Sequence, residues 1–188
     1  MQDQSFEYFE SNRPMETFLP VIKALIKTPK AFFEQMSPAY FFRDGIFFVS
    51  IIIFLATFVS MPFSNVLFLF LLPVTWGLLL VSLRFWSVYM AWAVRVFAKQ
   101  KLSTRQAFQI STYAAFPMVF VAVPVLGVLA SIWNLYLMWV GLVSYCKISG
   151  KSAAMIIMIP VIILLVSTVF LITLLIAVFP QLAGGLPH

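Results

Sequence analysis

Acidic residues are missing from most of this chain. All six Asp and Glu residues lie before residue 45, so residues 45–188 contain no carboxylate side chain. Proton-coupled transport, cation binding and carboxylate-assisted hydrolysis all use an acid. The sequence therefore says more about which functions this long segment lacks than about the function that it has.

Histidine and cysteine are almost as scarce. Cys146 is the only cysteine, which excludes an intrachain disulfide and a cysteine-based zinc site. His188 is the only histidine and the last residue, so we expect no catalytic histidine, no haem and no metal site. Because no base is available to activate a hydroxyl among the apolar segments, the sequence predicts a non-enzymatic protein without a cofactor.

Apolar residues are in excess. The chain is 63% hydrophobic and 10% charged, with a mean hydropathy of +1.04. Soluble proteins average about 45–50% apolar and about 25% charged residues, so the composition indicates an integral membrane protein. A net charge of +6 would suggest nucleic acid as the partner of a soluble protein. Here the cations flank apolar runs, so we expect a bilayer with anionic headgroups as the partner and no nucleic acid.

Five apolar segments predict an all-α, polytopic bundle of transmembrane helices. The predicted spans are residues 45–61, 66–83, 107–123, 125–146 and 153–178. Each is close to the roughly 20 residues that cross a bilayer. The second helix could continue through Phe97, which would leave it tilted or half emerged. The third and fourth segments could instead form a re-entrant hairpin, and the number of crossings would still be odd.

The cations between these segments predict the orientation. They occur before the first span, between the second and third, and between the fourth and fifth, whereas the intervening turns have none. In chain order they are Lys23, Lys27, Lys30 and Arg43, then Arg95, Lys99, Lys101 and Arg105, then Lys147 and Lys151. Cations concentrate on the cytoplasmic side of membrane proteins. We therefore expect a cytoplasmic N-terminus and a C-terminus on the far side.

The segment before the first span divides into two parts. Residues 1–17 are rich in acidic side chains and predict a flexible tail. Residues 18–44 predict two short amphipathic helices on the cytoplasmic leaflet, with Lys23, Lys27 and Lys30 facing lipid headgroups. A solvated surface helix is the alternative. The membrane domain then occupies residues 45–180, and residues 181–188 form a short tail.

A few polar side chains inside the spans need an explanation. Arg84 follows the second span and is expected to reach the inner headgroups. Asn134, with Ser131 one turn away, predicts an interhelical hydrogen bond, with ligand binding as the alternative. The small-residue stripe Ala107, Ser111 and Ala115 predicts close helix packing and is the nearest partner for Asn134.

The order of several short motifs resembles the Yip-domain family of five-span membrane proteins. These motifs lie between Pro29 and Val178, and they are Pro29-Lys30-Ala31-Phe32-Phe33, Tyr113-Ala114-Ala115-Phe116-Pro117 followed by Pro124, then Trp133, Gly141-Leu142 and Ser149-Gly150-Lys151-Ser152. Eukaryotic members of that family act in Golgi and ER trafficking and associate with Rab GTPases. The resemblance alone implies a Rab-type partner, and the acidic and aromatic tail motifs of trafficking members are not evident here. The short tail is similar to that of prokaryotic members and favours a bacterial inner membrane; a eukaryotic member would lie in the Golgi or ER.

Two functions are compatible with these patterns. The first is a non-enzymatic membrane organiser or adaptor that binds lipids, other membrane proteins or a second copy of itself. The second is an oligomeric subunit of a small transporter or channel for an anion or a lipid. A continuous polar path would favour the second, and few polar residues are available to build one.

Overall fold

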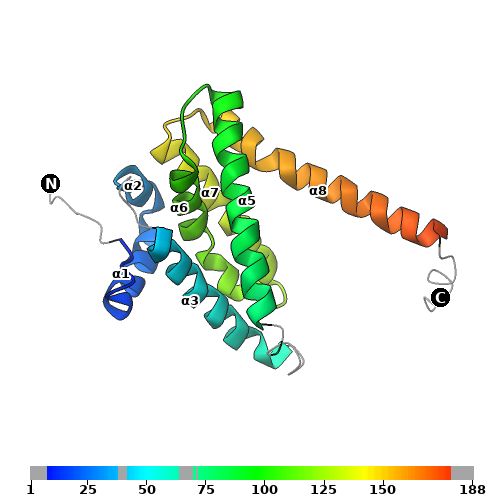
Figure 1. The fold of residues 1–188 in the computed structure, drawn as a ribbon, viewed down its shortest axis with the longest axis horizontal. Coiled ribbons are helices and arrows are strands. Elements are labelled where there is room, and N and C mark those ends of the chain that lie inside the picture. The colour runs from blue at the N-terminus through cyan, green and yellow to red at the C-terminus, as the bar shows by residue number, and fades with distance from the viewer. Residues whose placement is uncertain (1–7, 38–41, 64–69, 71, 179–188) are drawn as a thin grey trace.

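The structure, a computed structural model, describes residues 8–37, 42–63, 70 and 72–178. Within these ranges every regular element is a helix (Figure 1). In chain order the helices are α1 (Pro14–Lys27), α2 (Pro29–Glu34), α3 (Phe42–Ser60), the 3₁₀ helix η1 (Met61–Phe63), α5 (Leu72–Ala98), α6 (Thr104–Ala114), the 3₁₀ helix η2 (Phe116–Phe120), α7 (Leu126–Tyr145) and α8 (Gly150–Val178).

Four of these helices are long and apolar enough to cross a membrane: α3, α5, α7 and α8. They correspond to the first, second, fourth and fifth predicted spans. The second span continues as one helix to Ala98, as the sequence allowed. Its predicted beginning at residues 66–69 lies outside the described residues. The prediction of an all-helical membrane bundle is therefore confirmed.

The third predicted span, residues 107–123, is not a continuous helix. It begins as expected, because Ser103 and Gln106 form a capping box in which each side chain bonds the other's backbone N–H. It ends at Ala114, three residues before Pro117, which has no N–H to continue the helical hydrogen bonds. The chain then tightens into η2. A break of this kind is tolerated at membrane depth only where protein surrounds it.

Helix α6 meets that condition. Each residue from Ala107 to Ala114 is buried, and α6 contacts α3, α5 and α7. The helix is therefore central to the bundle and has no face left for lipid along this stretch. Figure 1 shows the ends of α5 and α7 on the same side of the bundle, where α6 also begins.

The end of the predicted flexible tail is instead part of the core. Phe9 is 1% exposed, and its ring lies 5.4 Å from that of Phe48 on α3. Its backbone N–H donates to the Tyr113 hydroxyl at 3.3 Å. Aromatic burial outweighs the polar composition here, so a flexible tail is wrong for residues 8–17. The rest of it, residues 1–7, lies outside the described residues.

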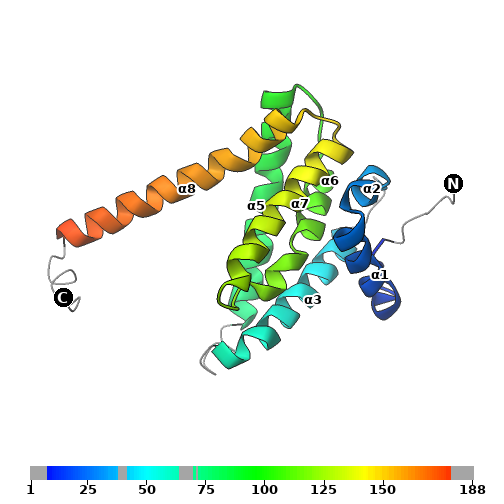
Figure 2. The ribbon, with the colours of Figure 1, turned by 180° about the vertical axis from the view of Figure 1, so that it is seen from behind.

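Helix α8 leaves the bundle soon after it starts. Its first turns are packed, with Ala153, Ile156 and Ile157 buried, and the Tyr89 hydroxyl of α5 donates to the Ile156 carbonyl at 2.9 Å. Beyond these turns α8 projects away from the other helices in both views (Figures 1 and 2). Most of its apolar side chains are therefore exposed, as expected for a helix surrounded by lipid.

Candidate functional site

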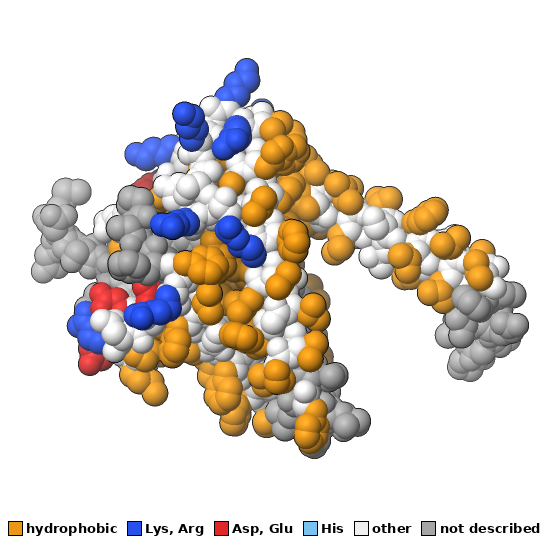
Figure 3. All heavy atoms as spheres, viewed as in Figure 1, with side chains coloured by type: hydrophobic (Ala, Val, Ile, Leu, Met, Phe, Trp, Pro, Cys, Tyr) orange, Lys and Arg blue, Asp and Glu red, His pale blue; other side chains and the backbone are white. Residues whose placement is uncertain are grey.

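Charged side chains gather on one part of the surface. Figure 3 shows Lys, Arg, Asp and Glu over the side that carries α1, α2 and the ends of α5 and α7, whereas the opposite end and α8 are apolar. The acidic groups of Glu10 and Glu16 both pair with Arg13, at 3.0 and 3.8 Å. The surplus charge of the surface is nevertheless positive, because the chain has 12 Lys and Arg against six Asp and Glu.

Helix α1 has three distinct faces. Thr17, Val21 and Leu25 are buried against the bundle. Met15, Leu19 and Ile26 recur at helical spacing on a second face and are 89%, 69% and 50% exposed. Lys23 and Lys27 lie on a third face, next to the exposed apolar one. A helix that only covers a protein core needs one apolar face, so the second apolar face is unexplained by packing within the chain. The two predicted helices are present, and one side of each is docked on the bundle.

The predicted headgroup contacts Lys23, Lys27 and Lys30 are all exposed. Lys30 lies 3.9 Å from the Glu34 carboxylate, an exposed pair that contributes little to stability. Lys23 and Lys27 form no ion pair with any residue in the described part of the chain. Both are therefore available to an external anion.

Arg84 is exposed beside a hollow of about 350 Å³ that lies between α5, α3 and α6. Phe42 and Ile46, at the beginning of α3, line the same hollow, together with Phe108 of α6. Arg84 therefore lies at the depth at which α3 begins. It forms no ion pair with the described residues, so it too is available to an anion.

Asn134 contacts the broken third segment. Its side-chain amide donates to the Ala114 carbonyl at 2.8 Å. Ser131 does not share this contact, because its hydroxyl donates to the Gly127 carbonyl of its own helix at 2.9 Å. The structure thus brings Asn134, but not Ser131, to α6.

The small-residue stripe divides between two neighbours. Ala107 and Ser111 are fully buried, and the Ser111 hydroxyl lies 3.4 Å from the Met90 sulfur of α5. Ala115 instead borders a cavity between α3 and α5. The stripe therefore lies against α5 and this cavity, and the Asn134 amide bonds the carbonyl of Ala114, the residue before the last member of the stripe.

A tight contact between α6 and α7 was not singled out as a packing site from the sequence. A Cβ atom on Gly141 would lie 2.6 Å from Cγ2 of Ile110 and 3.3 Å from the ring of Phe33. Only glycine allows the two helices to approach so closely. The pair Gly141-Leu142 was visible in the sequence, but which helix it would meet was not.

Tyr8 and Cys146 are two further described residues whose side chains can ionise. Tyr8 is half-buried beneath α2, and burial raises the pKa of its hydroxyl to about 12. Cys146 is a half-buried free cysteine after α7. In the described part of the chain, no three His, Cys, Asp or Glu side chains lie close enough to hold a metal ion.

Four apolar helices, a central broken helix and a one-sided charge distribution define a helical multi-pass integral membrane protein. The family model of the Yip1 domain matches residues 23–171. The chain therefore belongs to the Yip1 domain family. Comparisons with curated proteins and with solved structures give no match.

Proposed function

We propose that this protein is a non-enzymatic organiser of its membrane, which binds anionic lipids and other membrane proteins through its basic side. The observation that carries the proposal is the surface of α1. A helix already docked through Val21 and Leu25 presents a second apolar face beside Lys23 and Lys27, which form no ion pair with the described residues. That combination suits the boundary between headgroups and acyl chains.

The polar groups within the long helices support binding rather than conduction. Several hydroxyls donate to a carbonyl one turn back in their own helix, at distances from 2.7 to 2.9 Å. These are the hydroxyls of Ser50, Thr57, Ser131, Thr168 and Thr173. A hydroxyl occupied in this way contributes little to a polar path for a solute.

We further propose five crossings, with the N-terminus in the cytoplasm and the C-terminus on the far side. The crossing beyond the four long helices is the third in chain order, made by α6 and η2. Their 11 and 5 residues extend about 26 Å in total, near the roughly 30 Å of a bilayer core. The burial of α6 supports this assignment, because a broken pass needs protein around it. The basic loops then share one side.

The experiment measures the depth of α1 in a bilayer. Full-length protein carrying Cys146→Ser receives one nitroxide label at Leu19→Cys, on the exposed apolar face, or at Lys101→Cys, in the 99–103 loop. In anionic nanodiscs, we expect the label at position 19 to collide often with oxygen and rarely with a water-soluble nickel chelate. The label at position 101 should show the opposite preference, because that loop lies in water.

Charge dependence completes the test. Lys23→Gln with Lys27→Gln should reduce the share of anionic lipid recovered around the protein from mixed nanodiscs. Lys99→Gln with Lys101→Gln removes the same charge from a basic loop whose one apolar residue, Leu102, is buried, and as the matched control it should reduce the share less. Nickel accessibility at position 19 equal to that at position 101 would refute the interfacial role of α1. An unchanged lipid share in the α1 variant would refute its electrostatic part.

A further inference from the structure

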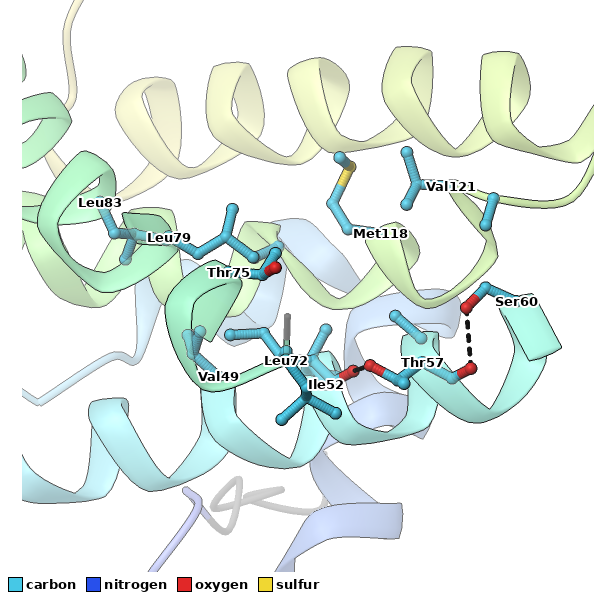
Figure 4. A pocket seen from close by; sticks show the side chains of 14 residues that line it. Val49, Ile52, Thr57, Ser60, Leu72, Thr75, Leu79, Leu83, Met118 and Val121 are labelled. Carbon is cyan, nitrogen blue, oxygen red and sulfur yellow. Dashed lines mark hydrogen bonds between the residues drawn. The ribbon is translucent and has the colours of Figure 1, made fainter. Parts of the chain in front are cut away.

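A partly open cavity of about 290 Å³ lies between α3, α5 and the segment that follows α6. Figure 4 shows its walls: Val49 and Ile52 come from α3, Leu79 and Leu83 from α5, and Met118 from η2, and these side chains point toward a common space. The α3 wall is buried. Leu79 and Val121, which also line the cavity, are 43% and 45% exposed.

The described lining offers almost nothing to a polar ligand. Thr57 donates its hydroxyl to the Ile53 carbonyl at 2.9 Å, and Ser60 donates to the Thr57 carbonyl at 2.7 Å (Figure 4). Thr75, the third polar residue of the wall, also has a partner. A water molecule in a cavity needs two to four polar partners, so this one disfavours water. An ion or a sugar would be left equally unsatisfied.

The surroundings indicate what fills the space instead. The cavity lies along α3 and α5, two helices that are long and apolar enough to cross the bilayer, so hydrocarbon is the medium around its opening. Protein interiors are close-packed, and a void of this size loses contacts along its whole lining. Its volume is at the lower end of the range for small-molecule sites, about 300–1,000 Å³, and suits a single chain better than a whole lipid.

We propose that this cavity holds one acyl chain of a bilayer phospholipid. The chain enters between Leu79 and Val121 and packs on the buried α3 wall. This goes beyond the proposed function, because the cavity contacts the hydrocarbon and not the headgroup. Zwitterionic and anionic phospholipids should therefore be held equally well. The contacts of Lys23 and Lys27, in contrast, depend on headgroup charge.

The experiment asks whether lipid stays with the protein after delipidation. Full-length protein is reconstituted with phosphatidylcholine or phosphatidylglycerol carrying a photoreactive group in the acyl chain. It is then washed extensively in detergent, irradiated, and analysed by intact and peptide mass spectrometry. We expect about one phospholipid per chain from either lipid, attached to the cavity-lining positions of α3 and α5.

Two substitutions close the cavity from different sides. Ala56→Phe fills it from the α3 wall, and Leu79→Trp narrows it from the exposed border. Ala177→Phe makes the same Ala-to-Phe change on the exposed surface of α8 and is the matched control. Circular dichroism and gel filtration verify that each variant is folded. Both cavity variants should lose most of the retained phospholipid, whereas Ala177→Phe should retain it.

Three outcomes would overturn the proposal. The first is that washing leaves no phospholipid on the unmodified protein. The second is that all three variants retain phospholipid equally. The third is that the cavity holds detergent even when phospholipid is supplied. Retention that requires an anionic headgroup would assign the lipid to the basic side instead. The two proposals fail separately: an unchanged anionic lipid share in the α1 variant would refute the headgroup contact alone, and loss of phospholipid from the washed, unmodified protein would refute the acyl-chain site alone.

Discussion

The side-chain amide of Asn134 on α7 donates a hydrogen bond to the carbonyl oxygen of Ala114 at the end of α6, across 2.8 Å. In a continuous helix, that carbonyl would accept from the N–H of residue 118. The N–H of Met118 bonds instead to the Ala115 carbonyl at 3.0 Å, because the helix tightens into η2 before Pro117. The amide therefore replaces a backbone hydrogen bond that the break removes, in a region without water to do so.

Replacing Asn134 by Leu should destabilise the bundle. The change leaves the Ala114 carbonyl without its partner, and interhelical hydrogen bonds in membranes are worth about 0.6–2 kcal/mol. Unfolding in detergent, followed by circular dichroism, measures the loss. Ser131→Ala is the control, because Ser131 bonds only its own helix and its removal should change little. Equal stability of Asn134→Leu and the unmodified protein would contradict the packing role.

Replacing Gly141 by Ala should also destabilise the protein. The new Cβ would lie 2.6 Å from the stiff, branched side chain of Ile110, so α6 and α7 must separate. Overpacking of this kind costs about 1–3 kcal/mol. The same unfolding measurement applies, and Ile110→Ala in the Gly141→Ala background should cost less than it does alone.

Gly77→Ala is the matched control for that contact. Gly77 lies inside α5, and apart from the adjoining backbone of that helix no described atom lies within 4 Å of where its Cβ would be. The change should be neutral or should stabilise the helix by up to about 1 kcal/mol, because Ala favours helix. If both glycine variants lost the same stability, the loss at Gly141 would not come from the contact with Ile110.

Alkaline pH should weaken the attachment of the N-terminal segment. Burial raises the pKa of Tyr8 to about 12, above the usual value of 10.0, because the phenolate form is disfavoured there. The neutral hydroxyl therefore contributes stability below pH 10 that is lost as the pH rises toward 12. Stability measured across this interval should fall more steeply in the unmodified protein than in Tyr8→Phe. Parallel curves would show that Tyr8 is not the responsible group.

Reporter fusions test the topology. Fusions after Gln100 and after Gly150 should both report the cytoplasm, because each of these residues lies between two lysines in a segment that joins two spans. A fusion after Gly185 should report the far side of the membrane. A cytoplasmic signal from that last fusion would refute an odd number of crossings, and with it the crossing assigned to α6 and η2.

The elements that the sequence predicted well depend on local properties. Hydropathy over about 20 residues located α3, α7 and α8, since crossing a bilayer requires only that each stretch be apolar. The capping box of Ser103 and Gln106 is equally local, because its partners are three residues apart. The family resemblance depended likewise on short motifs in a fixed order. The match to the Yip1 domain model confirms that resemblance.

The remaining features needed the tertiary structure. Whether α6 continues past Pro117 depends on neighbours that surround the break, and the burial of Phe9 depends on Tyr113, which lies 104 residues away in the chain. The second apolar face of α1 becomes visible only once the first is docked, because the periodicity of a helix does not say which face meets the protein. The cavity between α3 and α5 likewise exists only where separate helices diverge. Sequence alone determined which segments enter the membrane, and contacts between distant segments decided which surfaces they leave for lipid.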